Sequence, residues 1–224
     1  MKALIFDSGT LINLSMNGLL PILEDLKKNC SCSFMITQAV KREVIDRPLG
    51  IQRFELGALC IQSLLESGIL QMPSGIGVDD NIIQEETHDL MDIANHYLQI
   101  NGKWVPIVSE AEISCLALSD ILSKRGIETL IAIDERTTRM LCENPESLEK
   151  VMSEKIHQQV KLIAPNFKIF QNYRFIRSSE LVYVAYKKGL IKLQGKNVLE
   201  ALLYATKFKG AAISFEEIDV LKKL

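Results

Sequence analysis

The sequence predicts an α/β protein of three layers, in which helices cover both faces of a central parallel sheet and a helical extension follows. Short apolar runs alternate with amphipathic stretches over most of the chain, and strands joined in this way run parallel through right-handed crossovers. The chain has 224 residues, 47% of them hydrophobic, which is enough to bury a substantial core. No repeat or low-complexity tract interrupts the alternation.

Six apolar runs have the length and composition of buried strands. They are residues 2–6, 33–37, 68–72, 104–108, 129–133 and 160–164. Helical periodicity marks residues 19–28, 38–46, 51–66, 79–99, 110–126 and 135–143. Strand and helix therefore alternate, and the carboxyl ends of the strands are expected to meet at one edge of the sheet.

The pattern changes near residue 145, and residues 146–224 are predicted to form a basic, mainly helical extension. Two of its helices should end at Gly189 and Gly210, because glycine suits the left-handed position after a helix. Ser214 and Glu217 have the spacing of a capping box that opens a last helix.

Charge is distributed unevenly along the chain, although the formal net charge is only −2. Residues 1–149 hold 12 Lys and Arg against 22 Asp and Glu, whereas residues 150–224 hold 14 against 6. An acidic part beside a basic part is typical of a metal-dependent enzyme that acts on nucleic acid. A solvated, Lys-rich surface would give the same counts and is the alternative.

Hydropathy and cysteine usage predict a cytoplasmic protein with no membrane part. Only five residues separate Met1 from Asp7, which is too short for a secretory signal, and no run approaches the roughly 20 apolar residues of a membrane span. The five cysteines are an odd number and lie mostly in apolar stretches, so free thiols in a reducing compartment are expected.

The stretch "IFDSGTLINL" at residues 5–14 looks like a phosphatase signature, Asp-x-Asp-Gly-Thr after a buried strand. That signature places its nucleophilic aspartate three residues before the glycine and its second aspartate directly before it. This chain has Phe6 and Ser8 at those positions, so Asp7 is out of register for phosphatase chemistry. Asp7 stands instead where the first strand should end, which is where open parallel sheets bind ligands.

Acidic residues also follow three other predicted strands, namely Glu43, then Glu110 and Glu112, then Asp134 and Glu135. At about 4 Å and an effective dielectric near 20, two like charges repel by roughly 4 kcal/mol, so such a cluster requires cations. Oxygen ligands of this kind suit Mg²⁺ or Mn²⁺. Helix capping is the alternative role, because Ser109 and Glu112 match a capping box and Asp134 has the position of an N-cap.

Four segments together resemble the PIN-domain ribonucleases. These are "LIFDSGTLINL", similar to the family's opening strand with Asp-[Ser/Thr]-x-x-Leu-Ile, then "ITQAVKREVID", "SEAEISCLALS" and "LIAIDERTTRML", similar to its second, third and fourth motifs. They cover most of residues 1–143, and the tail resembles the end of a prokaryotic, toxin-like branch. Residues 72–104 look like an insertion, and Ser109 and Thr138 replace a glycine and an alanine of the usual pattern.

The resemblance implies a nuclease domain in residues 1–145 that hydrolyses RNA phosphodiester bonds with one or two Mg²⁺ or Mn²⁺ ions. It assigns metal binding and catalysis to Asp7, Glu43, Glu112 and Asp134, with Glu110 and Glu135 in reserve. Ser8 and Thr10 are expected to support the metal site. The RNA phosphates are expected to contact Lys41, Arg42, Arg136 and Arg139.

Besides RNA, the resemblance implies two protein partners, a second copy in a homodimer and, for a toxin, a small antitoxin. The alternative function is an RNA-binding or assembly module on the same fold, with a metal site too imperfect to cut RNA.

Overall fold

A five-stranded parallel sheet forms the centre of the protein, whose computed structural model describes residues 2–163 and 166–224. Its strands are β1 (Lys2–Phe6), β2 (Cys32–Met35), β3 (Leu70–Gln71), β6 (Glu128–Ala132) and β8 (Phe175–Ile176). They lie in the order β3-β2-β1-β6-β8, and every neighbouring pair is parallel. The sheet order thus places β1, and the residue that follows it, in the middle.

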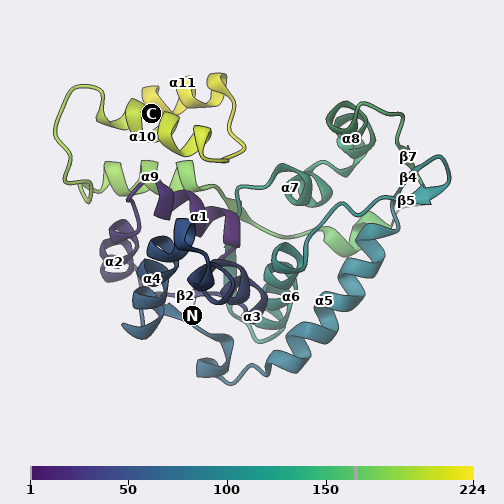
Figure 1. The fold of residues 1–224 in the computed structure, drawn as a ribbon, viewed down its shortest axis with the longest axis horizontal. Helices are drawn as coiled ribbons and strands as arrows, with labels where there is room; N and C mark the ends of the chain where they lie inside the picture. Colours follow the sequence, from purple (N-terminus) through teal and green to yellow (C-terminus); the bar gives the residue numbers. More distant parts are fainter. Residues whose placement is uncertain (1, 164–165) are drawn as a thin grey trace.

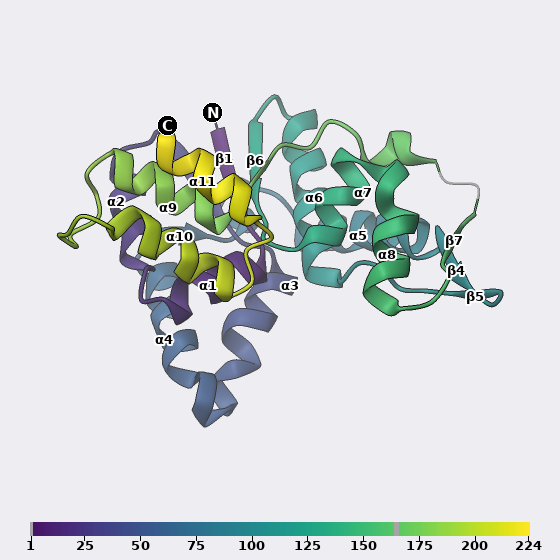
Figure 2. The same ribbon diagram turned by 90° about the horizontal axis from the view of Figure 1, so that it is seen from above.

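Helices cover both faces of this sheet, so the chain is a three-layer α/β/α protein (Figures 1 and 2). They are α1 (Ser8–Met16), α2 (Pro21–Lys28), α3 (Gln38–Lys41), α4 (Gln52–Glu66), α5 (Asp80–Asn95), α6 (Glu110–Lys124), α7 (Arg136–Glu143), α8 (Leu148–Ile156), α9 (Ser178–Lys187), α10 (Val198–Phe208) and α11 (Phe215–Lys223). The helices that connect the first three strands lie on one side with α9 to α11. On the other side α6 contacts β1 and β6, and α5 packs against α6.

The core is built on the two central strands, whose apolar side chains are almost all buried. Ile5 is paired with Met35 on one side and with Ile131 on the other, and all three side chains are fully buried. The Phe6 and Phe34 rings meet edge to face at 5.4 Å. Burial of each such side chain stabilises the fold by roughly 1.5–3 kcal/mol, which explains why near-continuous apolar runs predicted these strands correctly.

The predicted strand at residues 104–108 is wrong. Residues 105–109 have no regular structure, and only Lys103–Trp104 forms a strand, β5, in a separate antiparallel sheet. Pro106 has no backbone N–H and therefore cannot donate a hydrogen bond to a neighbouring strand. The Ile107 amide donates instead to the Asn95 side-chain oxygen at 2.8 Å, so the buried apolar residues of this run are held by a side chain of α5.

The predicted strand at residues 160–164 lies in the same small sheet rather than in the central one. Its described part, β7 (Lys161–Leu162), pairs with β4 (Leu98–Ile100), and residue 164 lies outside the described residues. The fifth central strand is β8, which pairs with β6 and is not predicted from the sequence. Residues 146–224 therefore contribute a strand to the central sheet as well as helices to its surface.

The helices of residues 178–224 agree with the sequence prediction. Gly189 and Gly210 follow α9 and α10 with φ of +69° and +117°, and Ser214 and Glu217 form both bonds of a capping box at α11. Helix α1 is not predicted; it begins because the Asp7 side chain accepts a hydrogen bond from the Gly9 amide.

Two other sequence expectations concern cysteines and membranes. Cys30 and Cys32 are bonded as a disulfide, so the expectation of free thiols is wrong for this pair, whereas Cys60, Cys115 and Cys142 are free. Within residues 2–163 and 166–224, no helix has both the length and the apolar character needed to cross a bilayer.

Candidate active site

Asp7 lies at the end of the central strand and is 3% exposed. Its amide donates to the Ala132 carbonyl at 2.9 Å, which ties it to β6, and its Oδ2 accepts from the Gly9 amide at 3.0 Å. Its Oδ1 is buried and has no hydrogen-bond partner among the described residues. Burial raises the pKa of Asp7 to about 7, with a further contribution from the Glu112 carboxylate and a smaller one from Glu43.

Glu112 lies in the first turn of α6 and is partly buried. Its Oε2 accepts from the Ser109 amide at 3.0 Å and from the Thr138 hydroxyl at 2.8 Å. The first bond belongs to the capping box that the sequence predicts. Burial raises the pKa of Glu112, and the nearby Glu135 carboxylate raises it further. Glu112 is thus both a capping residue and an electrostatic neighbour of Asp7.

Glu43 lies in a π-helical turn, Arg42–Asp46, that continues α3. Such turns are rare and are frequent at functional sites. The half-buried Glu43 carboxylate makes a small contribution that raises the pKa of Asp7. Asp7, Glu112 and Glu43 are called the acid set below.

The Asp134 carboxylate already accepts three hydrogen bonds from protein donors. Oδ1 accepts from the Ser178 amide at 2.7 Å, and Oδ2 accepts from the Ser178 hydroxyl at 2.7 Å and from the Asn13 amide group at 2.9 Å. The N-cap of α7 is Glu135, not Asp134. Asp134 therefore joins α1, β6 and α9.

The two reserve acids form ion pairs. Glu135 caps α7 by accepting from the Thr138 amide at 2.7 Å, and it lies 3.5 Å from the Lys155 amino group. Glu110 is paired with Arg42. Both carboxylates thus have hydrogen-bond or ion-pair partners, whereas Asp7 Oδ1 has none among the described residues.

A divalent cation fits part of this arrangement. In the described parts of the chain, no three His, Cys, Asp or Glu side chains lie close enough together to hold a metal ion. The partnerless Asp7 Oδ1, however, is a buried anionic ligand next to two other carboxylates, and a cation would remove both the desolvation cost and the repulsion. The residues that could hold Mg²⁺ or Mn²⁺ are therefore the acid set, whereas the Asp134 carboxylate is already bonded to Ser178 and Asn13.

The hydroxyl groups predicted to support the site lie in the same turn as Asp7. Ser8 Oγ and Thr10 Oγ1 are buried without a hydrogen-bond partner among the described residues. The segment from Asp7 to Thr10 thus contains three buried polar atoms that have no hydrogen-bond partner among the described residues. This is unusual, because buried polar groups nearly always form hydrogen bonds.

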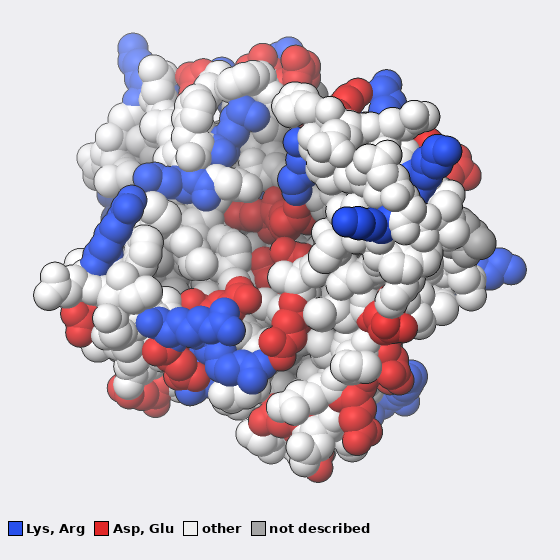
Figure 3. All heavy atoms as spheres, turned by 45° about the vertical axis from the view of Figure 1, so that its right-hand side comes forward, with Lys and Arg blue, Asp and Glu red and all other residues white. Residues whose placement is uncertain are grey.

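Lys and Arg side chains lie on the margins of a hollow in which Asp and Glu side chains gather (Figure 3). Of the four predicted phosphate contacts, three are in ion pairs: Lys41 with Asp46 at 2.7 Å, Arg42 with Glu110, and Arg139 with Glu143 at 3.1 Å. Arg136 is exposed and makes no ion pair with the residues described here. Arg136 is thus the predicted contact most available to an anion.

Three residues that the sequence did not single out as site residues support the acids, and a fourth, Arg177, lies next to one of them in the chain. Asn13 and Ser178 hold Asp134, and Thr138 holds Glu112. Arg177, 7% exposed, donates to Glu180, to Glu217 at 2.8 Å and to the Ala212 carbonyl at 2.9 Å. Of these residues, only Thr138 is noted in the sequence, because it replaces the alanine of the family pattern.

No family model, curated protein or solved structure matches this chain. The resemblance to the PIN-domain ribonucleases therefore depends on the short motifs alone, and the activity that it implies is a proposal.

Proposed function

We propose that this protein is a metal-dependent ribonuclease. The observation that carries the proposal is Asp7, a buried carboxylate at the end of the central strand with an oxygen that has no partner and two further carboxylates beside it. Such crowding of negative charge is unfavourable without a cation, and oxygen ligands favour Mg²⁺ or Mn²⁺. The order of the four motifs and the excess of Lys and Arg in residues 150–224 favour RNA as the substrate.

The acids, Thr138 and Arg136 would have different roles in binding the cation and the RNA. Asp7, Glu112 and Glu43 would hold the cation, which supplies charge neutralisation and Lewis-acid polarisation at the phosphodiester. Thr138 and the Ser109 amide fix the orientation of Glu112 through its Oε2. Arg136 would bind a non-bridging phosphate oxygen, because its charge is not already paired within the described chain.

A second candidate function is an RNA-binding module that does not cut. It is favoured by the saturated Asp134 carboxylate and by the finding that no three potential ligands are close together in the described residues. The phosphatase alternative predicts hydrolysis of small phosphomonoesters, and we expect none because Asp7 is out of register.

The test is cleavage of a structured RNA with and without Mn²⁺. We expect Mn²⁺-dependent cleavage by the natural protein and its loss in Asp7→Asn, with no loss of thermal stability in chelator. Asp89→Asn is the matched control, because Asp89 is an 82% exposed carboxylate on α5, outside the acid set. Retained RNA binding without metal-stimulated cleavage would reject the nuclease and support the binding module.

A further inference from the structure

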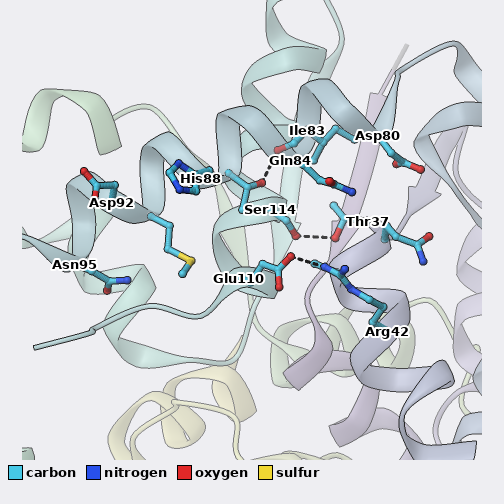
Figure 4. A pocket seen from close by; sticks show the side chains of 14 residues that line it. Thr37, Arg42, Asp80, Ile83, Gln84, His88, Asp92, Asn95, Glu110 and Ser114 are labelled. Carbon is cyan, nitrogen blue, oxygen red and sulfur yellow. Dashed lines mark hydrogen bonds and ion pairs between the residues drawn. The ribbon is translucent and has the colours of Figure 1, made fainter.

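A cavity of about 390 Å³ lies between α5, the start of α3 and the first turn of α6, the helix that carries Glu112 (Figure 4). This volume is in the range of small-molecule sites, about 300–1,000 Å³. One wall of the cavity is α5, which belongs to residues 72–104, the segment that the family resemblance does not account for.

The cavity and the acid set are joined by an ion pair. Arg42 and Glu110 both line the cavity and bind each other across it (Figure 4). Arg42 directly precedes Glu43, and Glu110 lies two residues before Glu112 on α6. The segments that line this end of the cavity therefore also carry two members of the acid set.

The lining combines amide groups with apolar surface. Gln38, Gln84 and Asn95 supply side-chain amides, and Ala39, Ile83 and Met91 supply the apolar part. Thr37 and Ser114 are bonded to each other at 2.6 Å, so their hydroxyls are already engaged (Figure 4). Amides that can donate and accept, set among apolar side chains, suit a flat ligand with a hydrogen-bonding edge.

The charges of the lining exclude a phosphate from the interior. Asp80, Asp92 and Glu110 are acidic, and the single Lys or Arg of the lining, Arg42, is already paired with Glu110. A neutral base avoids this repulsion, and its exocyclic amino group can donate to the Asp80 oxygen that is buried without a partner. The phosphate of the same nucleotide would stay outside, toward Arg42 and the acid set.

We propose that this cavity binds one unpaired nucleobase of the RNA, adjacent to the bond that is cut. The proposal rests on the proposed function, because it places the base next to the nuclease site. Proteins that recognise single-stranded RNA hold splayed-out bases by stacking and by hydrogen bonds to the base edges. The substrate class is therefore RNA with a single-stranded nucleotide at the cleavage site, and Gln38 and Gln84 determine which base is accepted.

The test uses the full-length protein and the four ribonucleosides adenosine, guanosine, cytidine and uridine, which carry no phosphate. Binding is followed by NMR through the methyl group of Met91, assigned with Met91→Leu. We expect at least one nucleoside to shift this signal with saturation, and Gln84→Leu and Gln38→Leu to weaken its binding by roughly tenfold. Gln52→Leu, the same change at an exposed position of α4 outside the cavity, should bind as the natural protein does.

Two results would overturn the proposal: no nucleoside shifts Met91, or nucleosides bind equally well to the Gln38 and Gln84 variants. A Met91 shift caused only by a Lys-rich peptide would assign the cavity to a protein partner and reject the base. Nucleosides carry no scissile bond, so binding is measured independently of cleavage. Nucleoside binding without Mn²⁺-dependent cleavage would support the base site and reject the nuclease. Cleavage without nucleoside binding would support the nuclease and reject the base site.

Discussion

At the scale of single residues, Asp7 is an acid kept where its charge is unfavourable. Its pKa of about 7, against an ordinary 3.8, means that the folded protein binds a proton that the unfolded chain releases near pH 4. The free energy of unfolding should therefore fall as pH rises from about 4 to about 7 and then level off. The cost at high pH is on the order of 4 kcal/mol if the whole shift is realised.

We predict that Asp7→Asn stabilises the protein at pH 8 in chelator by ~2 kcal/mol, because the amide is neutral. The gain should vanish below pH 4, where the natural carboxyl is protonated in both states. Urea unfolding at several pH values measures this. Equal stability of the two proteins across this range would show that Asp7 is not held in a charge-disfavouring site.

At the scale of secondary-structure elements, Asp134 connects three of them through one carboxylate. We predict that Asp134→Ala lowers the free energy of unfolding by ~2–4 kcal/mol, since the Ser178 amide and the Asn13 side chain would be buried without partners. Denaturant unfolding of the variant measures this loss. Asp89→Ala is the control and should change stability by less than about 0.5 kcal/mol. A similar small effect for Asp134→Ala would mean that water replaces the carboxylate.

Elements could be predicted from the sequence where local pattern decides them. The apolar runs of β1 and β6 and the capping boxes at Ser109 and Ser214 are local, and the structure contains all of them. The run at residues 104–108 misled because Pro106 cannot donate to a neighbouring strand and the Ile107 amide bonds to the Asn95 side chain instead. Strand β8 has two residues and gave too little pattern to detect.

Part of the site follows from strand-end positions. Asp7 stands at the end of β1, and the Glu112 and Glu43 carboxylates raise its pKa, as expected for acids that follow parallel strands ending at one edge. The hydrogen bonds to Asp134 could not be predicted, since its donors Ser178 and Asn13 lie 44 and 121 residues away along the chain. Partners that lie this far apart along the chain produce no recognisable motif in the sequence.

At the scale of the whole molecule, residues 146–224 complete the central sheet and bind Asp134. Arg177 binds Glu217 and the Ala212 carbonyl, and the Ala212 amide donates to the Asp134 carbonyl at 3.2 Å. This network fastens the last helix to the strand that carries Asp134. The basic extension therefore belongs to the same folding unit as the acid set.

We predict that the full chain unfolds in one transition, and that a chain ending at residue 145 shows no cooperative unfolding. The full-length test compares far-ultraviolet circular dichroism with the fluorescence of Trp104, the single tryptophan, which lies in the small sheet against His96. Coincident curves are expected. A cooperative transition in the shortened chain would show instead that residues 1–145 fold alone.

The bond from the Asn13 side chain to the Thr206 carbonyl spans 193 residues. On the ribosome, at about 5–20 residues per second, Asn13 waits roughly 10–40 s before Thr206 is even synthesised. Until then the Asn13 side chain, which also donates to Asp134, lacks one of its two acceptors. The complete set of bonds around Asn13 therefore forms only when nearly the whole polypeptide has been synthesised.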